Sequence, residues 1–338
     1  MTVNRDIVVS SRVRLARNIK NLPFGMKFNK LHSDNIALDV YRNIGGERTG
    51  FGLYKPSSPE SLDGTVLKEK RLISEDLLSK APLASVILNE SETVSIMIGE
   101  EDHIRIQSIE PGFNLNKSFI ATDKIDNIIA KNIPLSFSEK LGYLTACPTN
   151  LGTGLRVSAM MFLPGLSIYN SLEECVQAMS RLNMAIRGVY GEGSDSSGYL
   201  YQLSNQRTLG LSEEAILEAV ISSVLKIVEA EKQAREVLLN EGGATLKDKI
   251  RRALGTLLYA HKIESAEFNT TMALVKLGAY YGFFDILDSN KFEKLFIEAQ
   301  PASLQSICKK KLSQQDRDIF RAKYVSDVLN SIIQINGV

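Results

Sequence analysis

The spacing of apolar residues changes along this chain from a period of two to a helical period. Residues 93–99 and 103–109 alternate apolar and polar positions around Gly99-Glu-Glu-Asp102, which predicts two adjacent antiparallel strands. Similar strand patterns occur at residues 6–15, 84–90 and 199–205. Helical patterns intervene at residues 125–133 and 172–186, and from Ser212 onward the pattern is helical. The chain therefore predicts an α/β (α+β) fold, an antiparallel sheet flanked by helices and followed by an all-helical region.

Helix start and stop signals predict where the chain divides. Ser212 followed by two glutamates predicts a helix start, and Gly242-Gly243 predicts the end of that helix. Residues 245–248 and 313–316 fit the capping-box pattern, so each is expected to open a further helix. We place a boundary near residue 243. The expected domains are residues 1–243 and 244–338.

The charge and cysteine content restrict the class of protein. Lys and Arg number 40 against 39 Asp and Glu, so net charge gives no reason to expect nucleic acid or an anionic membrane as a partner. No apolar run approaches the roughly 20 residues that span a bilayer. The cysteines are odd in number and far apart, which argues against a disulfide framework. We expect a cytoplasmic protein that binds neither nucleic acid nor membrane.

The common nucleotide-binding motifs do not occur in the sequence. It has no GxxxxGK[ST] loop and no HRD or DFG signature. Arginines can bind a triphosphate instead, because guanidinium groups form charge-assisted, often bidentate hydrogen bonds to phosphate oxygens. Strand alternation places Arg12 and Arg14 on one face, and further candidates are Arg105, Arg156 and Arg187. A single arginine on a strand face is more often solvated or ion-paired at the surface, so spacing alone leaves both interpretations open.

Four segments carry these arginines and the acidic residues near them. They are residues 10–18 (SSRVRLARN), 99–107 (GEEDHIRIQ), 147–156 (CPTNLGTGLR) and 187–193 (RGVYGEG). In this order they resemble the ATP:guanido phosphotransferases, the family of creatine and arginine kinases. Residues 221–238 and the RDIFRA motif at 317–322 are similar to the McsB-type protein arginine kinases of that family. The resemblance implies a guanido kinase catalytic domain followed by a helical domain.

The resemblance implies a role for each candidate residue. The side chains that would grip the ATP phosphates are Arg12, Arg14, Arg105, Arg156 and Arg187. Glu101 matches the catalytic carboxylate and Glu192 the second carboxylate beside the substrate guanidinium, while Cys147 stands at the family's thiol position. Two carboxylates can orient a guanidinium nitrogen toward the γ-phosphorus and accept its proton. From the residues alone, Glu101 fits a solvated turn and Cys147 a small buried hydrophobe.

Three positions depart from the family pattern. Arg71 stands where the family usually has a histidine near the adenine ring. An arginine plane can still stack on a base, so Arg71 stays an ATP-binding candidate. Met160 and Phe162 also replace family histidines.

The distal RDIFRA motif supports two interpretations. Arg317 and Arg321 are four residues apart and share a helix face on which Asp318 can pair with them. Spacing alone favours a salt-bridged exposed face. The resemblance instead implies an allosteric phosphoarginine site, in which arginines hold the phosphoryl group and the carboxylate holds the guanidinium.

The resemblance implies that ATP, with Mg²⁺, phosphorylates exposed arginines of proteins. It also implies marking of those proteins for a Clp-type protease and its Clp ATPase, action on a CtsR-like heat-shock repressor, a McsA-like activator and a homodimer. One alternative is a small-molecule phosphagen kinase, against which the lack of a helical amino-terminal domain argues. A second is a non-catalytic phosphoarginine-binding adaptor, against which the presence of Glu101 and Glu192 argues.

Overall fold

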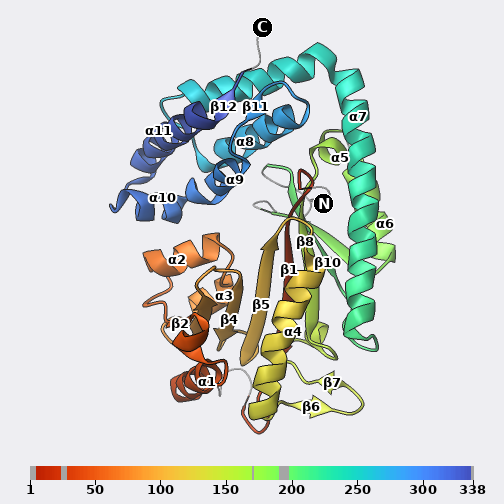
Figure 1. Ribbon diagram of the computed structural model, residues 1–338, viewed down its shortest axis with the longest axis vertical. Coiled ribbons are helices and arrows are strands. Elements are labelled where there is room, and N and C mark those ends of the chain that lie inside the picture. The colour runs from red at the N-terminus through yellow and green to blue at the C-terminus, as the bar shows by residue number, and fades with distance from the viewer. Residues whose placement is uncertain (1–4, 24–28, 170, 190–197, 336–338) are drawn as a thin grey trace. The chain divides into compact units, whose positions relative to one another are not determined.

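The computed structural model describes residues 5–23, 29–169, 171–189 and 198–335, and it combines helices with a large antiparallel sheet (Figure 1). The predicted α+β class with a helical carboxy-terminal part is confirmed. The chain forms two compact units. The first contains Met1–Met161, Val176–Ile186 and Gln202–Lys226, and the second contains Phe162–Cys175, Arg187–Tyr201 and Ile227–Val338.

The main sheet has the strand order β2-β3-β4-β5-β1-β8-β10-β9 across the described residues. The pairs from β2 to β8 are antiparallel. The strands are β1 (Val8–Arg17), β2 (Phe51–Tyr54), β3 (Ser85–Asn89), β4 (Val94–Ile98), β5 (Ile104–Pro111), β8 (Leu155–Phe162), β9 (Met184–Gly188) and β10 (Leu200–Asn205). Two short pairs complete the strands, namely β6 (Phe137–Ser138) with β7 (Gly142–Tyr143) and β11 (Asp285–Ile286) with β12 (Ile333–Gln334).

The predicted antiparallel pair is confirmed as β4 and β5, and the other predicted strands appear as β1, β3 and β10. The helix predicted at residues 172–186 was wrong at its carboxy-terminal end. Helix α6 spans Leu172–Arg181, and the chain then enters β9. Asn183 lies between them with a φ of 56°, a left-handed conformation that stops a helix.

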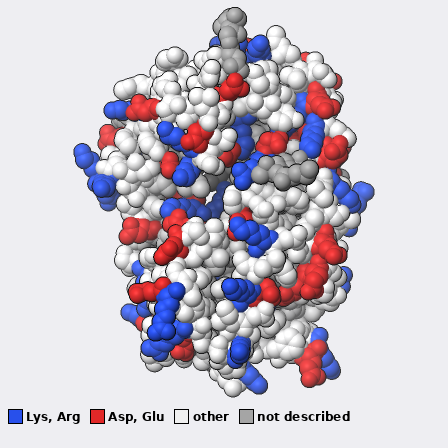
Figure 2. All heavy atoms as spheres, viewed as in Figure 1, with Lys and Arg blue, Asp and Glu red and all other residues white. Residues whose placement is uncertain are grey.

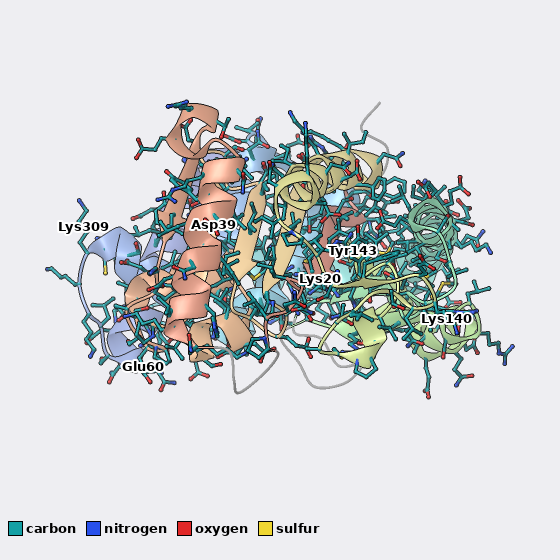
Figure 3. All side chains as sticks on the ribbon, turned by 90° about the horizontal axis from the view of Figure 1, so that it is seen from below. Lys20, Asp39, Glu60, Lys140, Tyr143 and Lys309 are labelled. Carbon is teal, nitrogen blue, oxygen red and sulfur yellow. The ribbon has the colours of Figure 1, made fainter. Side chains whose placement is uncertain are left out.

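Helices and 3-10 turns of the sheet region are α1 (Lys30–Asn43), η2 (Gly46–Thr49), α2 (Leu62–Glu69), α3 (Glu75–Ser79), α4 (Leu115–Asn132), η3 (Pro148–Asn150) and α5 (Pro164–Ile168). A capping box opens α1, since Asn29 Oδ1 accepts a hydrogen bond from His32 N at 3.0 Å and His32 Nδ1 accepts one from Asn29 N at 3.4 Å. Ile36 and Val40 on the inner face of α1 are buried, whereas Asp39 is exposed on its outer face (Figure 3). The helix thus buries one apolar face.

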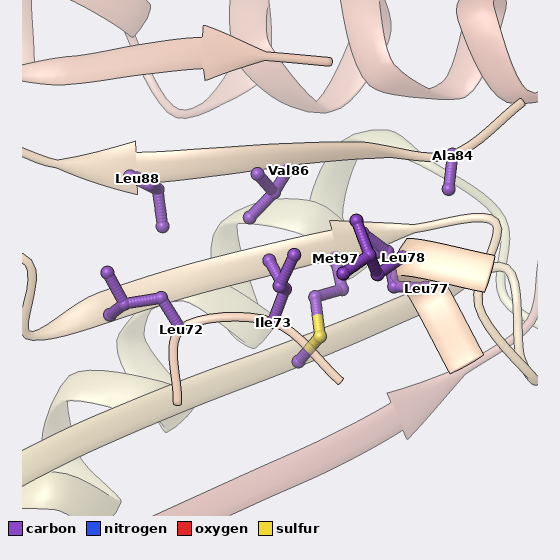
Figure 4. Close-up of a cluster of buried hydrophobic side chains, with 8 residues drawn as sticks. All are labelled: Leu72, Ile73, Leu77, Leu78, Ala84, Val86, Leu88 and Met97. Carbon is purple, nitrogen blue, oxygen red and sulfur yellow. The ribbon is translucent and has the colours of Figure 1, made fainter. Parts of the chain in front are cut away.

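A hydrophobic cluster fixes the segment around α3 against the sheet (Figure 4). Leu77 and Leu78 of α3 pack with side chains of β3 and β4. The cluster consists of Leu72, Ile73, Leu77, Leu78, Ala84, Val86, Leu88 and Met97. Full burial of a leucine contributes about 1.5–3 kcal/mol. The cluster therefore holds Arg71 and Ser74, which border it in the sequence, close to the sheet.

Besides α5, the second unit contains the helices of the carboxy-terminal part. They are α7 (Glu213–Tyr259, which begins in the first unit), α8 (Ser265–Tyr280), α9 (Ser289–Glu298), α10 (Pro301–Cys308) and α11 (Gln314–Ile332). Ser212 Oγ accepts a hydrogen bond from Ala215 N at 3.1 Å, as the predicted helix start requires. Gly243 interrupts α7 with φ 41° and ψ −124°, and a further helical stretch follows. No helix in the described parts of the chain is long and apolar enough to cross a membrane.

The apolar residues at helical spacing in α7 and α8 are mostly buried. Leu254, Leu257, Leu274 and Leu277 are each at most 5% exposed. Tyr280 differs, because it is 42% exposed and its ring lies 4.4 Å from the guanidinium carbon of Arg235. A phenol ring can remain partly in water when a cation covers its face.

Candidate active site

The central strand β1 presents two arginines on one side. Val13 and Leu15 are fully buried. Arg12 and Arg14, which alternate with them along the strand, are half-buried. Antiparallel pairing with β8 sets Arg14 directly opposite Arg156. On an antiparallel pair, directly opposite residues project to the same face of the sheet. Strand register therefore brings Arg156 to the arginines of β1.

An open pocket of about 100 Å³ lies at this part of the sheet. Three predicted arginines and the predicted catalytic glutamate line it: Arg14, Arg105, Arg156 and Glu101. The other lining residues are Ala16, Thr149, Asn150 and Gly154. Strands β1, β5 and β8 thus bring residues that are far apart in the sequence to one place.

One buried donor at this pocket lacks a hydrogen-bond acceptor. The Nε atom of Arg14 is buried and has no partner among the described residues. Leaving a buried donor unsatisfied costs about 1–3 kcal/mol. An anion bound in the pocket would offset that cost, so the lining fits a phosphate group.

Positive charge is concentrated here, whereas basic and acidic side chains are interspersed on the face drawn in Figure 2. Burial first, and then the charges of Arg71, Arg105 and Arg156, lower the pKa of Arg12 to about 9. Burial and the charges of Arg12, Arg105 and Arg156 also lower the pKa of Arg14. Neighbouring cations that disfavour each other's charge favour a bound polyanion.

Glu100 is a polar residue of this site that the sequence did not single out. Its side chain is buried and forms an ion pair with Arg105. Its Oε1 accepts a hydrogen bond from Ser74 Oγ at 2.6 Å, and its Oε2 accepts one from Glu101 N at 2.7 Å. Glu100 therefore orients both the arginine and the turn that carries Glu101. In the sequence, the one indication of a role for Glu100 is that it directly precedes Glu101.

Glu101 and the loop that carries Cys147 approach the pocket from two separate segments of the sequence, but Cys147 itself does not line it. The Glu101 side chain is 39% exposed, and its Oε2 lies 3.5 Å from Nη2 of Arg105. Cys147 is half-buried and precedes η3, where its Sγ lies 3.0 Å from Thr149 Oγ1. Thr149 lines the same pocket as Glu101. The carboxylate is therefore accessible to a ligand in the pocket.

Arg71 faces the same arginine group. It follows α2 in a left-handed conformation with a φ of 63°, and its carbonyl oxygen accepts a hydrogen bond from Gln107 Nε2 at 2.9 Å. Its guanidinium contacts the sulfur of Met160. Among the neighbouring charges that lower the pKa of Arg12, the charge of Arg71 has the largest effect. The structure thus places Arg71 with the predicted phosphate-binding side chains.

Five of the predicted catalytic and ATP-binding residues are not among those that line the pocket. Arg12, Arg71 and Cys147 belong to the same compact unit as the lining residues. Arg187 is exposed on β9 and belongs to the second compact unit, whereas the lining residues all belong to the first. Glu192 lies outside the described residues.

The distal motif is arranged differently from the exposed face that its spacing favours. Ser313 caps α11, and Asp318 and Arg321 within that helix are 4% and 0% exposed. Arg321 donates to the carbonyl oxygens of Ala299 and Ile263 at 2.8 and 2.7 Å and to Asp318 Oδ1 at 2.6 Å. The pair is buried because α11 packs against the end of α9 and the residues before α8.

Arg317 is placed apart from that buried pair. It is half-buried, and its Nη1 lies 3.4 Å from the carbonyl oxygen of Leu312. This bond is at the weak limit of hydrogen-bond geometry. The guanidinium of Arg317 is therefore held less firmly than that of Arg321.

Two family models match this sequence. The ATP:guanido phosphotransferase, C-terminal catalytic domain, matches residues 34–234, and the Protein-arginine kinase McsB C-terminal domain matches residues 243–336. The protein-arginine kinase of Clostridium kluyveri is 42% identical over 332 residues, which cover 96% of this chain and 95% of its own length. The protein-arginine kinase of Caldanaerobacter subterraneus subsp. tengcongensis is 40% identical over 331 residues, which cover 97% of this chain and 98% of its own length.

Solved structures of two kinases have a similar fold. Lombricine kinase superposes with a TM-score of 0.60 and 25% identity, covering 71% of this chain and 69% of its own. The duplicated taurocyamine kinase of Schistosoma mansoni, with bound transition state analog components, gives a TM-score of 0.57 and 26% identity. That match covers 69% of this chain and 33% of the taurocyamine kinase chain.

Proposed function

This chain belongs to the protein-arginine kinases of the ATP:guanido phosphotransferase family, and from that premise we propose that its arginine-lined pocket transfers the γ-phosphate of ATP to arginine side chains of proteins. The observation that supports this most is the convergence of Arg14, Arg105 and Arg156 on one pocket together with Glu101. A cationic cradle and a carboxylate are the two components that phosphoryl transfer to a guanidinium requires.

In this proposal the arginines bind the nucleotide. Those that hold the phosphates are Arg12, Arg14, Arg105, Arg156 and Arg187, with Arg71 toward the base. Negative charge spreads over the oxygens of the transferring phosphoryl, and fixed guanidinium groups stabilise it without rearranging. The unsatisfied Nε of Arg14 supports this assignment.

The carboxylates serve the substrate arginine. A guanidinium stays protonated at neutral pH because its pKa is high, and its nitrogens are poor nucleophiles in that form. Glu101 and Glu192 would orient it, and Cys147 would flank it. One guanidinium nitrogen attacks the γ-phosphorus, the P–N bond forms, and the bond from phosphorus to the ADP oxygen breaks. The proton released from that nitrogen moves to the Glu101 carboxylate.

Magnesium enters this account as part of the nucleotide substrate. No group of three or more His, Cys, Asp or Glu side chains that could hold a metal occurs in the described portion of the chain. The pocket offers three arginines and one glutamate, a set that suits phosphate oxygens rather than a cation. Mg²⁺ would therefore arrive on the ATP phosphates.

The carboxy-terminal match supports proposals about cellular role. We assign residues 1–243 to catalysis and 244–338 to a helical domain for dimerisation and phosphoarginine binding, with Arg317 reaching the phosphoryl group and Asp318 and Arg321 shaping the site. The modified proteins would be marked in the cytoplasm for a Clp protease. A CtsR-like repressor would be one substrate, and a McsA-like protein the activator.

Mass spectrometry of a mixed protein substrate incubated with ATP and Mg²⁺ tests the substrate class. We expect phosphoarginine on proteins. Added free arginine should change the yield of protein phosphoarginine little, because a protein-arginine kinase selects side chains. Acid must be avoided during handling, since it cleaves the P–N bond. Phosphorylation of free arginine alone would instead support a small-molecule kinase, and failure to modify either would support the adaptor.

The affinity for ATP should fall by about tenfold between pH 8 and pH 10. Phosphate binding requires the charged form of Arg12, whose pKa in the free protein is about 9, so the free site loses its proton across this range. Calorimetric titration at the two pH values measures the change. Adenosine lacks the phosphates and serves as the control, whose affinity should stay constant. A constant ATP affinity would contradict the loss of the Arg12 proton between pH 8 and pH 10, because an arginine that keeps its charge keeps its attraction for phosphate.

A further inference from the structure

A buried carboxylate next to Glu101 holds two separate segments of the site. Asp102 is 1% exposed, and its Oδ1 atom accepts hydrogen bonds from Asn18 Nδ2 at 2.7 Å and from the backbone nitrogen of Ala146 at 2.7 Å. Its Oδ2 atom is also buried and has no hydrogen-bond partner within the described residues. Both of its bonds therefore pass through one oxygen, and that oxygen joins the turn at Glu101 to the loop at Cys147.

The Asn18 side chain completes the connection. Its Nδ2 donates to Asp102 Oδ1 and to the carbonyl oxygen of Leu144 at 3.1 Å, while its Oδ1 accepts from His103 N at 2.8 Å. Asn18 directly follows β1, so it ties the end of the central strand to the same two segments. We call these two side chains the Asn18–Asp102 clamp.

The two clamped segments carry two of the three groups assigned to the substrate guanidinium, Glu101 and Cys147. Asp102 directly follows Glu101, and Ala146 directly precedes Cys147. Thr149 and Asn150, a few residues along the same loop, line the pocket with Glu101. A displacement of about 1 Å at a reacting group can cost 10²-fold in rate. The position of one loop relative to the other is therefore important for transfer.

We propose that Asp102 is a positioning residue that, with Asn18, sets the Cys147 loop against Glu101. The inference rests on the proposed function for the roles of Glu101 and Cys147. Asp102 acts as a hydrogen-bond acceptor in this arrangement and exchanges no proton with substrate. An asparagine at this position keeps the Oδ1 acceptor for both donors, whereas an alanine removes it.

The test compares Asp102→Asn with Asp102→Ala. We expect Asp102→Ala to lower kcat by about 10²-fold with KM for ATP unchanged, and Asp102→Asn to retain most of the activity, because only the acceptor geometry is needed. Equal loss in the two variants would overturn the inference, since it would mean that the negative charge is required.

A second measurement does not depend on kinase activity. The alkylation rate of Cys147 by iodoacetamide, followed by peptide mass spectrometry without ATP, should rise about tenfold in Asp102→Ala, the effect expected when a loop loses a bond to a charged acceptor. Cys175 and Cys308 provide internal controls, and their rates should not change. An unchanged Cys147 rate in Asp102→Ala would overturn the inference.

Control variants separate positioning from loss of stability. Asp123→Ala removes a carboxylate that bonds Asn127 on α4, and Ile36→Ala removes buried apolar atoms from α1. Neither residue belongs to the clamp, so both variants should show wild-type alkylation at Cys147. If Asp102→Ala does not fold, Asn18→Ala gives the same test through the loss of its bonds. A wild-type protein without kinase activity would refute the proposed function, while the alkylation rates would still test the clamp.

Discussion

Replacing Glu101 with glutamine lowers kcat for phosphorylation of protein arginine by about 10²–10⁴-fold, the range that a general base contributes. Glutamine keeps the size of the side chain and can accept a hydrogen bond, but it cannot take the proton that leaves the guanidinium. The side chain is 39% exposed, so the substitution should leave the fold intact. Steady-state kinetics with a protein substrate measures the loss.

Glu92→Gln is the matched control for that variant. The Glu92 side chain is 43% exposed and pairs with Lys70 at 2.8 Å, an environment similar to that of Glu101 beside Arg105. The kcat of the Glu92→Gln enzyme should equal that of the wild type. ATP affinity should be unchanged in both variants, because the phosphates are assigned to the arginines. A Glu101→Gln enzyme with wild-type kcat would exclude the carboxylate as the base.

Replacing Arg321 with methionine should lower the free energy of unfolding by about 3–5 kcal/mol. The change removes three hydrogen bonds, leaves the carbonyl oxygens of Ala299 and Ile263 without this donor, and leaves Asp318 buried without its cation. Urea denaturation followed by circular dichroism measures the loss.

Arg317→Met provides the comparison within the same motif. Arg317 is half-buried and held by one long hydrogen bond, so its loss should change stability by less than about 1 kcal/mol. If it reaches a phosphoryl group as proposed, the variant should bind phosphoarginine more weakly than the wild type. Equal stability of the Arg321 and Arg317 variants would contradict the structural role of Arg321.

The sequence predicted the faces of single strands but not how those strands assemble. Period-two alternation separates Arg12 and Arg14 from Val13, and the structure shows the same separation. The meeting of Arg105 and Arg156 with β1 depends on the strand order β5-β1-β8, which alternation within one strand does not encode. Family resemblance suggested that these residues share a site, and the fold supplies the geometry.

Burial of charged residues was the information that the sequence lacked. Glu100 and Glu101 are chemically identical neighbours, but the side chain of Glu100 is buried with Ser74 and Arg105 as partners, whereas that of Glu101 is 39% exposed. Arg321 is buried by carbonyl groups of residues 263 and 299, which are distant in the sequence. Such partners come from tertiary packing, so local patterns could not predict them.

Phosphorus NMR of the wild-type protein with ATP, Mg²⁺ and a protein substrate is the most direct test of the pocket as a protein-arginine kinase site. The ATP γ-phosphate signal should decline while a protein-bound phosphoramidate signal grows, and acid should abolish the new signal. The Glu101→Gln protein should bind ATP without forming that signal. Release of inorganic phosphate alone, or an acid-stable phosphoester on the substrate, would contradict the account.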